Sequence, residues 1–318
     1  MHAVRLRIVL LAGAALLAAL VAISAVTRWQ RAASNGYWGR YQNGGCFVGI
    51  APGMTYDEKV VIFATPDSGQ GDIIELNLES GVRRPLANAG VYEGFPCVTK
   101  HGTLIYSKAD PESGACQLHQ LEPGESKPKR LTASTDSDEE PCSDLSGTLI
   151  VFSRSQRDHS PRHSHIFSIN RENGTLKQLT FGKANKDRSP AINADGSIIA
   201  FVRNADEIWI MDVDGNNSRF LCRGHSPKWA ASAHRLAYIG DPSLKQRYDL
   251  FVLDVDTMSH TQITADGRYK WSPTFTFDDT RLIYVEDESC QGDGSIIQIG
   301  VDGTGRRVIA DVRDRANR

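Results

Sequence analysis

Short apolar runs separated by turn residues fill the stretch 189–221. The runs 198–202 and 208–211 are too short for helices and are rich in β-branched and aromatic residues. Asn, Asp and Gly stand between them, where tight hairpins need positive φ angles. The pattern predicts four antiparallel strands, at 191–192, 198–202, 208–211 and 220–221. One such sheet cannot bury both of its faces, so we expect the pattern to recur.

The pattern recurs along the chain. A proline opens the first predicted strand of five copies, at intervals of 37 to 49 residues: Pro96, Pro141, Pro190, Pro227 and Pro273. A weaker copy precedes them, in which the second strand is 60–63 and a longer connection, 52–58, leads into it. A period near 45 residues with four strands is typical of propeller blades. The sequence therefore predicts an all-β fold, a six-bladed β-propeller of four-stranded antiparallel blades over residues 46–311.

The order of the strands separates two faces of the predicted disc. We label the strands of a blade A to D from the axis outward. The A–B and C–D turns then lie on one face (the A–B face), and the B–C and D–A segments lie on the other (the B–C face). Length variation collects in the B–C segments, at 108–114, 153–164, 240–247 and 286–294. Insertions gathered on one face are typical of a binding surface, so we expect the functional surface on the B–C face, around the mouth of the channel.

The N-terminal region predicts a membrane anchor. Residues 8–26 carry no charge and consist almost entirely of Ala, Leu, Val and Ile, enough for a helix to span a bilayer. A cleaved signal peptide is the alternative, because Ala22-Ile23-Ser24 offers a cleavage site. The expected layout is a signal anchor or signal peptide over 1–27, a linker over 28–45, the propeller, and a polar tail over 312–318. We expect a single-pass protein of the cell membrane with its propeller in the periplasm or outside the cell, or a secreted protein after cleavage.

Composition restricts the partners. The 36 Lys and Arg residues nearly balance the 38 Asp and Glu residues, giving a net charge of −2, so no nucleic-acid partner is expected. We find no phosphate loop, dinucleotide fingerprint or nucleophile elbow, and we predict no cofactor, no metal and no catalytic residue. The remaining prediction is a monomer that binds a protein or peptide.

Two charged segments are candidates for partner binding on the B–C face. In 154–165 the candidates are Arg154, Arg157, His159, Arg162, His163 and His165. A solvated loop is the alternative there, since a metal site at the histidines lacks a third ligand at a recognisable spacing. In 136–140, a predicted D–A linker, the candidates are Asp136, Asp138, Glu139 and Glu140. These acids would bind a basic peptide or Ca²⁺, and a solvated acidic turn is the alternative.

The six cysteines suit an exported protein. We predict all six at one end of the disc: Cys46, Cys97 and Cys142 at the starts of strands A, Cys116 and Cys290 in B–C segments, and Cys222 at the end of a strand D. The sequence leaves their pairing open. A disulfide between Cys46 and Cys290 would join the first blade to the last, and buried free thiols are the alternative.

The repeat resembles that of the TolB-like six-bladed propellers. The match is carried by Pro190-Ala-Ile-Asn-Ala-Asp-Gly-Ser-Ile-Ile-Ala-Phe201, by Ile208-Trp-Ile-Met-Asp-Val-Asp-Gly215, and by the endings Leu131-Thr132 and Leu179-Thr180. The resemblance implies a non-catalytic, extracytoplasmic propeller that binds protein. TolB proteins carry a separate α/β domain before the propeller, and the short segment 28–45 leaves no room for one here.

The same repeat also occurs in peptidase propellers and lyases, so it is specific for fold more than for function. A carbohydrate-active enzyme of the oligogalacturonate-lyase kind, using His159, His163 and His165, is therefore one alternative. An envelope structural or sensor protein is the other.

Overall fold

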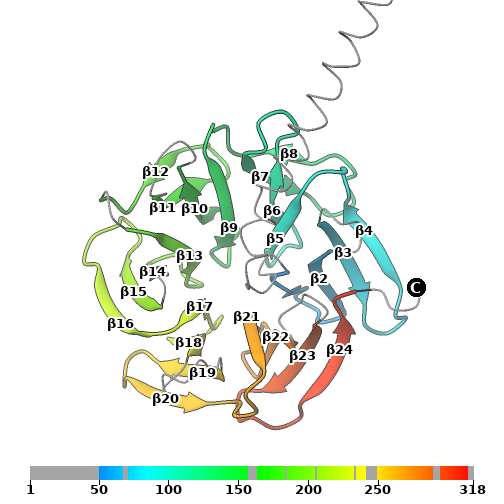
Figure 1. The fold of residues 1–318 in the computed structure, drawn as a ribbon, viewed down its shortest axis with the longest axis vertical. Helices are drawn as coiled ribbons and strands as arrows, with labels where there is room; N and C mark the ends of the chain where they lie inside the picture. Colours follow the sequence, from blue (N-terminus) through cyan, green and yellow to red (C-terminus); the bar gives the residue numbers. More distant parts are fainter. Residues whose placement is uncertain are drawn as a thin grey trace, which may run out of the picture. The chain divides into compact units, whose positions relative to one another are not determined.

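Six sheets of four antiparallel strands surround a central axis in the computed structural model (Figure 1). The structure describes residues 50–66, 71–156, 163–182, 185–204, 206–232, 234–240, 249–288 and 294–313. Contacts divide the chain into two units, 1–46 and 47–318, and all described residues belong to the second. The predicted anchor helix and linker lie outside them. Within the described ranges, no helix is long and apolar enough to cross a membrane.

Strands follow one another from the axis outward in every blade, as predicted. Blade 1 comprises β1 (Gly53–Met54), β2 (Val60–Thr65), β3 (Asp72–Asn77) and β4 (Arg83–Ala87); blade 2 comprises β5 (Glu93–Val98), β6 (Leu104–Ala109), β7 (Cys116–Leu121) and β8 (Lys129–Arg130); blade 3 comprises β9 (Ser137–Ser143), β10 (Leu149–Ser155), β11 (Ser164–Asn170) and β12 (Leu176–Gln178). Blade 4 comprises β13 (Asp187–Ile192), β14 (Ile198–Arg203), β15 (Glu207–Asp212) and β16 (Arg219–Arg223); blade 5 comprises β17 (His225–Trp229), β18 (Arg235–Gly240), β19 (Asp249–Asp254) and β20 (Ser259–Gln262); blade 6 comprises β21 (Tyr269–Phe275), β22 (Arg281–Asp287), β23 (Ser295–Gly300) and β24 (Arg307–Asp311). The prediction of a six-bladed, all-β propeller is confirmed.

In blades 2 to 6 the inner strands begin before their prolines, which corrects the predicted start of strand A; in blade 1 the strand begins after its proline. β5 begins at Glu93 and β9 at Ser137, so Pro96 and Pro141 lie inside their strands. The residue before each proline has positive φ: Ala51 (34°), Phe95 (53°), Glu140 (58°), Ser189 (50°), Ser226 (53°) and Ser272 (51°). The pairing register shifts at this point in blades 2 to 6. A bulge on an edge strand accommodates a residue that has no N–H to donate, so the strand continues on both sides of the proline.

The A–B turns have one length in all six blades, whereas the C–D turns on the same face run from four residues at 255–258 to seven at 122–128. Each A–B turn is five residues long, at 55–59, 99–103, 144–148, 193–197, 230–234 and 276–280. The predicted long connection 52–58 in blade 1 is therefore wrong, because β1 lies within it. The B–C segments run instead from three residues at 204–206 to eight at 156–163 and 241–248.

Equivalent positions of the blades build the core between neighbouring sheets. Each second strand has a buried aromatic residue at the same position: Phe63, Tyr106, Phe152, Phe201, Tyr238 and Tyr284. The apolar clusters each contain residues from adjacent blades, so the sheets from blade 1 to blade 6 pack in turn against the next.

The threonine of the repeat's Leu-Thr ending, which is Ile-Thr in blade 5, has a structural role. Thr132, Thr180 and Thr264 each accept a hydrogen bond at Oγ1 from a third-strand backbone N–H, at 2.9 to 3.0 Å. These bonds satisfy buried donors where the short outer strand has ended.

Contacts between the last and first blades close the ring. Arg83 Nη2 donates to the backbone oxygen of Asp311 at 2.6 Å, and Arg281 Nη1 lies 3.6 Å from a carboxylate oxygen of Glu58. The rings of Tyr56 and Phe277 lie 5.2 Å apart, centroid to centroid. Ion pairing, hydrogen bonding and aromatic packing thus join blades 6 and 1.

Candidate binding face

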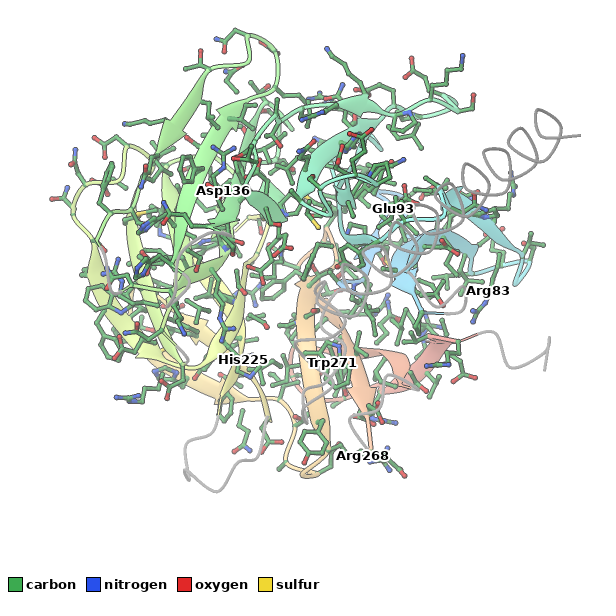
Figure 2. The ribbon with its side chains drawn as sticks, turned by 45° about the horizontal axis from the view of Figure 1, so that its top comes forward. Arg83, Glu93, Asp136, His225, Arg268 and Trp271 are labelled. Carbon is green, nitrogen blue, oxygen red and sulfur yellow. The ribbon has the colours of Figure 1, made fainter. Side chains whose placement is uncertain are left out.

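The first residues of the inner strands form a rim around the channel mouth on the B–C face. Glu93, Asp136, His225 and Trp271 come from four blades and stand around the centre of the ring in Figure 2. Glu93 and Trp271 are almost completely buried. The indole N–H of Trp271 has no acceptor among the described residues. The rim therefore holds several buried polar groups.

Three consecutive blades carry the same ion pair at the rim. An acid three residues before the proline faces a base two residues after the second-strand aromatic, and the two are directly opposite in the strand register. The three pairs are Glu93–Lys108 at 3.3 Å, Asp138–Arg154 at 2.6 Å and Asp187–Arg203 at 2.8 Å. Asp138 and Asp187 are fully buried, so each acid depends on its base for charge compensation.

Aromatic rings support the two arginines of these pairs. The guanidinium of Arg154 lies 4.6 Å from the ring centre of Phe167, and that of Arg203 lies 4.7 Å from the ring of Trp209. A planar guanidinium can bind a carboxylate along one edge while its face contacts an aromatic ring. These two bases are therefore held rigidly within their blades.

Blades 5 and 6 have other residues at the two positions of this ion pair. Blade 6 has the charges exchanged, with Lys270 opposite Glu286. Lys270 is buried and bonds the carboxylate of Asp266, while Glu286 accepts a hydrogen bond from Arg268 at 2.8 Å. Blade 5 has glycines at the corresponding positions, 224 and 240. A Cβ on either glycine would meet atoms of Tyr238 at less than 3 Å, so no larger residue fits there.

Burial shifts the ionisation of two rim residues. Burial raises the pKa of Glu93, although the N–H of Ala89 and the charge of Lys108 oppose the shift. Burial, together with the charge of Arg188, lowers the pKa of His225 to about 4. His225 is therefore neutral at physiological pH.

The predicted acidic segment lies in the strand β9 from residue 137 onward and not in a linker, because that strand starts before its proline. Asp136 is half-buried just before β9, Asp138 is paired with Arg154, and Glu139 is buried. Glu140 accepts hydrogen bonds from Ser189, at 2.6 Å from the backbone nitrogen and 3.0 Å from Oγ. It thereby joins the inner strands of blades 3 and 4. Partner binding by these acids stays a prediction.

The predicted basic segment is described only in part. Arg157, His159 and Arg162 lie outside the described residues. His163 is half-buried, and His165 is buried on β11 opposite Arg154. Burial lowers the pKa of His165, while Asp187 opposes that shift. Contact of this segment with a partner also stays a prediction.

Cysteine placement differs from the expectation for two residues. Cys97 and Cys142 lie in the second halves of β5 and β9, toward the A–B face, because these strands begin earlier than predicted. Cys116 begins β7 and Cys222 lies near the end of β16, both toward the B–C face. All four are free thiols. The proposed partners Cys46 and Cys290 lie outside the described residues.

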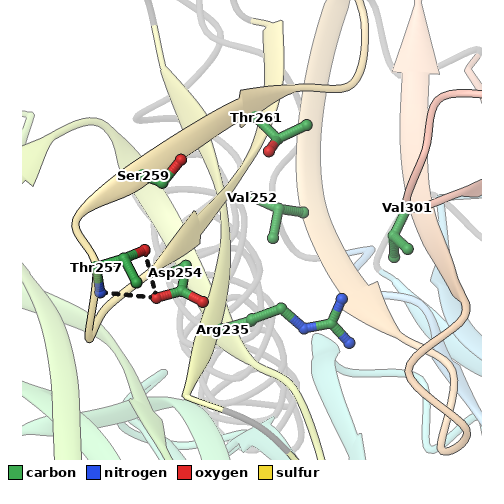
Figure 3. A pocket seen from close by; sticks show the side chains of 7 residues that line it. All are labelled: Arg235, Val252, Asp254, Thr257, Ser259, Thr261 and Val301. Atoms are coloured by element: carbon green, nitrogen blue, oxygen red, sulfur yellow. Dashed lines mark hydrogen bonds between the residues drawn. The ribbon is translucent and has the colours of Figure 1, made fainter.

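A shallow cavity of about 320 Å³ lies away from the rim, between blades 5 and 6 (Figure 3). Its lining comes from the A–B face and the outer strand β20, and includes Arg235, Asp254 and Val301. Asp254 Oδ1 already accepts hydrogen bonds from Thr257, at 2.8 Å from N and 2.7 Å from Oγ1. We therefore interpret this cavity as a groove between two neighbouring blades. In the described part of the chain, no three His, Cys, Asp or Glu residues are grouped to hold a metal ion.

Sequence and structure comparisons give different results. No family model and no curated protein matches the sequence. Among solved structures, TolB from Acinetobacter baumannii matches with a TM-score of 0.64 and 14% identity, covering 78% of this chain and 63% of that chain. A putative TolB from Agrobacterium tumefaciens matches with a TM-score of 0.62 and 16% identity, covering 74% and 87%. An oligogalacturonate lyase from Vibrio parahaemolyticus matches with a TM-score of 0.59 and 13% identity, covering 84% and 78%.

These matches confirm the predicted TolB-like propeller fold. The chain spans less than two thirds of the length of the Acinetobacter TolB chain. At identities of 13 to 16%, the likeness concerns the fold alone.

Proposed function

We propose that this TolB-like propeller is a non-catalytic protein that binds a protein or peptide partner through its B–C face. The difference between the A–B turns and the B–C segments carries the proposal. Every A–B turn has five residues and the C–D turns on the same face have four to seven, whereas the B–C segments vary from three to eight residues. Uniform turns serve a scaffold, and variable segments on one side of a rigid scaffold are where recognition usually resides.

Exposed aromatic side chains on the B–C face support protein binding. Phe181, in the segment that joins β12 to β13, is 66% exposed, and Tyr269, the first residue of β21, is 38% exposed. Aromatic side chains are enriched among the residues that dominate binding energy in protein interfaces. The rim acids beneath them are neutralised within the blades, so we expect aromatic contacts and hydrogen bonds from the B–C segments to supply most of the affinity.

The proposed cellular location of the protein rests on its N-terminal sequence. The uncharged run 8–26 supports a tether in the cell membrane, and the propeller would then work outside the cytoplasm.

Cell fractionation tests the tether. We expect the full-length protein in the membrane fraction after alkaline carbonate washing, with the propeller accessible to protease added from the non-cytoplasmic side. Recovery in the cytoplasmic fraction would contradict this part of the proposal.

Affinity capture from cells tests partner binding. The full-length protein, tagged at its C-terminus, is crosslinked in cells and purified, together with the variants Phe181→Ala and Met258→Ala. Met258 is 44% exposed in a C–D turn on the A–B face and serves as the matched control. We expect one partner enriched with the wild type and with Met258→Ala, and at least roughly tenfold less of it with Phe181→Ala. No enriched partner, or an equal loss with both variants, would contradict binding through the B–C face.

A further inference from the structure

The residue that follows the proline in each inner strand occupies one level of the channel. The six residues share the same pairing position opposite the second strand: Gly53, Cys97, Cys142, Ala191, Lys228 and Thr274. Two thiols and one amine therefore stand at this level, in blades 2, 3 and 5. Blades 3 and 5 are not neighbours, so side chains that join them must meet across the channel.

Contacts converge on the sulfur of Cys142. Its electrostatic partners are the thiol of Cys97 in blade 2, the amine of Lys228 in blade 5 and the backbone N–H of Ile192 in blade 4. Ser143 lies beside both thiols, with its Oγ 3.7 Å from Cys97 Sγ and its carbonyl oxygen 3.9 Å from Cys142 Sγ. As a thiol, Cys142 can donate to the Ser143 carbonyl, while the positive charge of Lys228 beside its sulfur favours the thiolate and lowers its pKa.

Electrostatics distinguish the two cysteines. The hydrogen bond from Cys97 lowers the pKa of Cys142 against the effect of burial, and Lys228 adds to the shift. The same hydrogen bond and burial raise the pKa of Cys97. Burial opposes the charge of Lys228, but Cys142, Cys97 and Glu140 together hold its pKa above the ordinary value. In contrast, burial alone raises the pKa of Cys222 to about 12.

We propose that Cys142 and Cys97 form a covalent modification site in the channel that reacts with small disulfides. The Cys142 thiolate attacks one sulfur of the small disulfide, forms a mixed disulfide and expels one thiolate. Cys97 then loses its proton, attacks the Cys142 sulfur and expels the second thiolate. The protein gives up two electrons and the Cys97 proton, and the small disulfide leaves as one thiol and one thiolate, which takes its proton from water. This chemistry does not depend on the partner proposed above.

Peptide mapping tests the product on the unaltered, full-length protein. The reduced protein is incubated with oxidised glutathione, quenched with acid and digested without reductant for mass spectrometry. We expect a Cys97–Cys142 disulfide in the wild type, and in Cys97→Ser a glutathione adduct on Cys142. A wild-type protein in which neither residue is oxidised, or in which both form disulfides only with other cysteines, would overturn the proposal.

Alkylation rates test the nucleophile. At pH 7, limiting iodoacetamide should modify Cys142 at least roughly tenfold faster than Cys222, because the thiolate is the reactive form. Lys228→Met should slow modification of Cys142 several-fold and leave Cys222 unchanged. Equal rates at Cys142 and Cys222 in the wild type would overturn the assignment, and this comparison needs no variant to fold.

Discussion

The guanidinium of Arg154 binds the carboxylate of Asp138 through two hydrogen bonds, from Nε to Oδ1 at 2.6 Å and from Nη2 to Oδ2 at 2.8 Å. The carboxylate is fully buried, while 13% of the arginine side chain remains exposed. Arg203 and Asp187 repeat the arrangement in the next blade. The pair thus links the channel wall to the second strand and keeps a charge beneath the binding face neutral.

Breaking this pair should destabilise the protein strongly. Arg154→Met leaves the buried carboxylate of Asp138 without compensation, and we expect the free energy of unfolding to fall by about 3 kcal/mol or more. Lys59→Met is the control, since Lys59 and Glu79 form an exposed pair at 3.9 Å that should contribute less than about 1 kcal/mol. Urea unfolding followed by tryptophan fluorescence measures both; equal losses would show that burial does not matter here.

The positive φ before each proline gives a second prediction. Ser272 has a φ of 51°, which glycine tolerates and β-branched residues resist. Ser272→Gly should leave the midpoint of thermal unfolding unchanged or raise it, whereas Ser272→Val should cost about 1 to 3 kcal/mol. Circular dichroism melting checks the order of the two variants. A valine variant as stable as the glycine variant would argue against the bulge.

The third prediction concerns the threonine that ends an outer strand. Thr180 Oγ1 accepts the backbone N–H of Ile166 at 2.9 Å, and the side chain is 5% exposed. Thr180→Val keeps the shape but leaves this N–H without its acceptor, so stability should fall by about 1 to 3 kcal/mol. Thr304→Val, at an exposed turn, should change stability by less than about 1 kcal/mol. If both variants unfold at the same urea concentration, the hydrogen bond has no special role.

His225 predicts how stability depends on pH. Its pKa is about 4 in the folded state, held down by burial and Arg188, whereas an unfolded histidine titrates near 6.5. Below about pH 6.5 the unfolded state therefore binds the extra proton, and stability falls until the pH reaches about 4. Wild type should lose about 3 kcal/mol more than His225→Gln between pH 7 and pH 4. Parallel pH profiles for the two proteins would refute the assignment.

Much of the fold follows from local pattern. Alternating apolar residues and turn residues within each copy predict the second strand and its aromatic residue, such as Phe201, and the repeat predicts the ring. The start of strand A could not be found this way, because the bulge before Pro190 arises only when the strand pairs with its neighbour. The misplaced start also put Cys97 and Cys142 at the wrong end of their strands.

The sequence allows part of the rim to be predicted, namely its ion pairs. Aligning the copies on their prolines would have placed Glu93, Asp138 and Asp187 at one position, with the opposing bases two residues beyond the aromatic. The exchanged charges at Lys270 and Glu286 belong to the same alignment. The approach of Lys228 to Cys142 could not be foreseen, since it depends on the width of the channel.

Site-specific photocrosslinking is the most direct test of which face binds. A photoreactive amino acid is placed at position 181 on the B–C face or at position 258 on the A–B face of the full-length protein in cells. Met258 is 44% exposed, so both probes are accessible. Binding through the B–C face predicts a discrete crosslinked partner from position 181 and none from position 258. A partner crosslinked from position 258 and not from position 181 would contradict it.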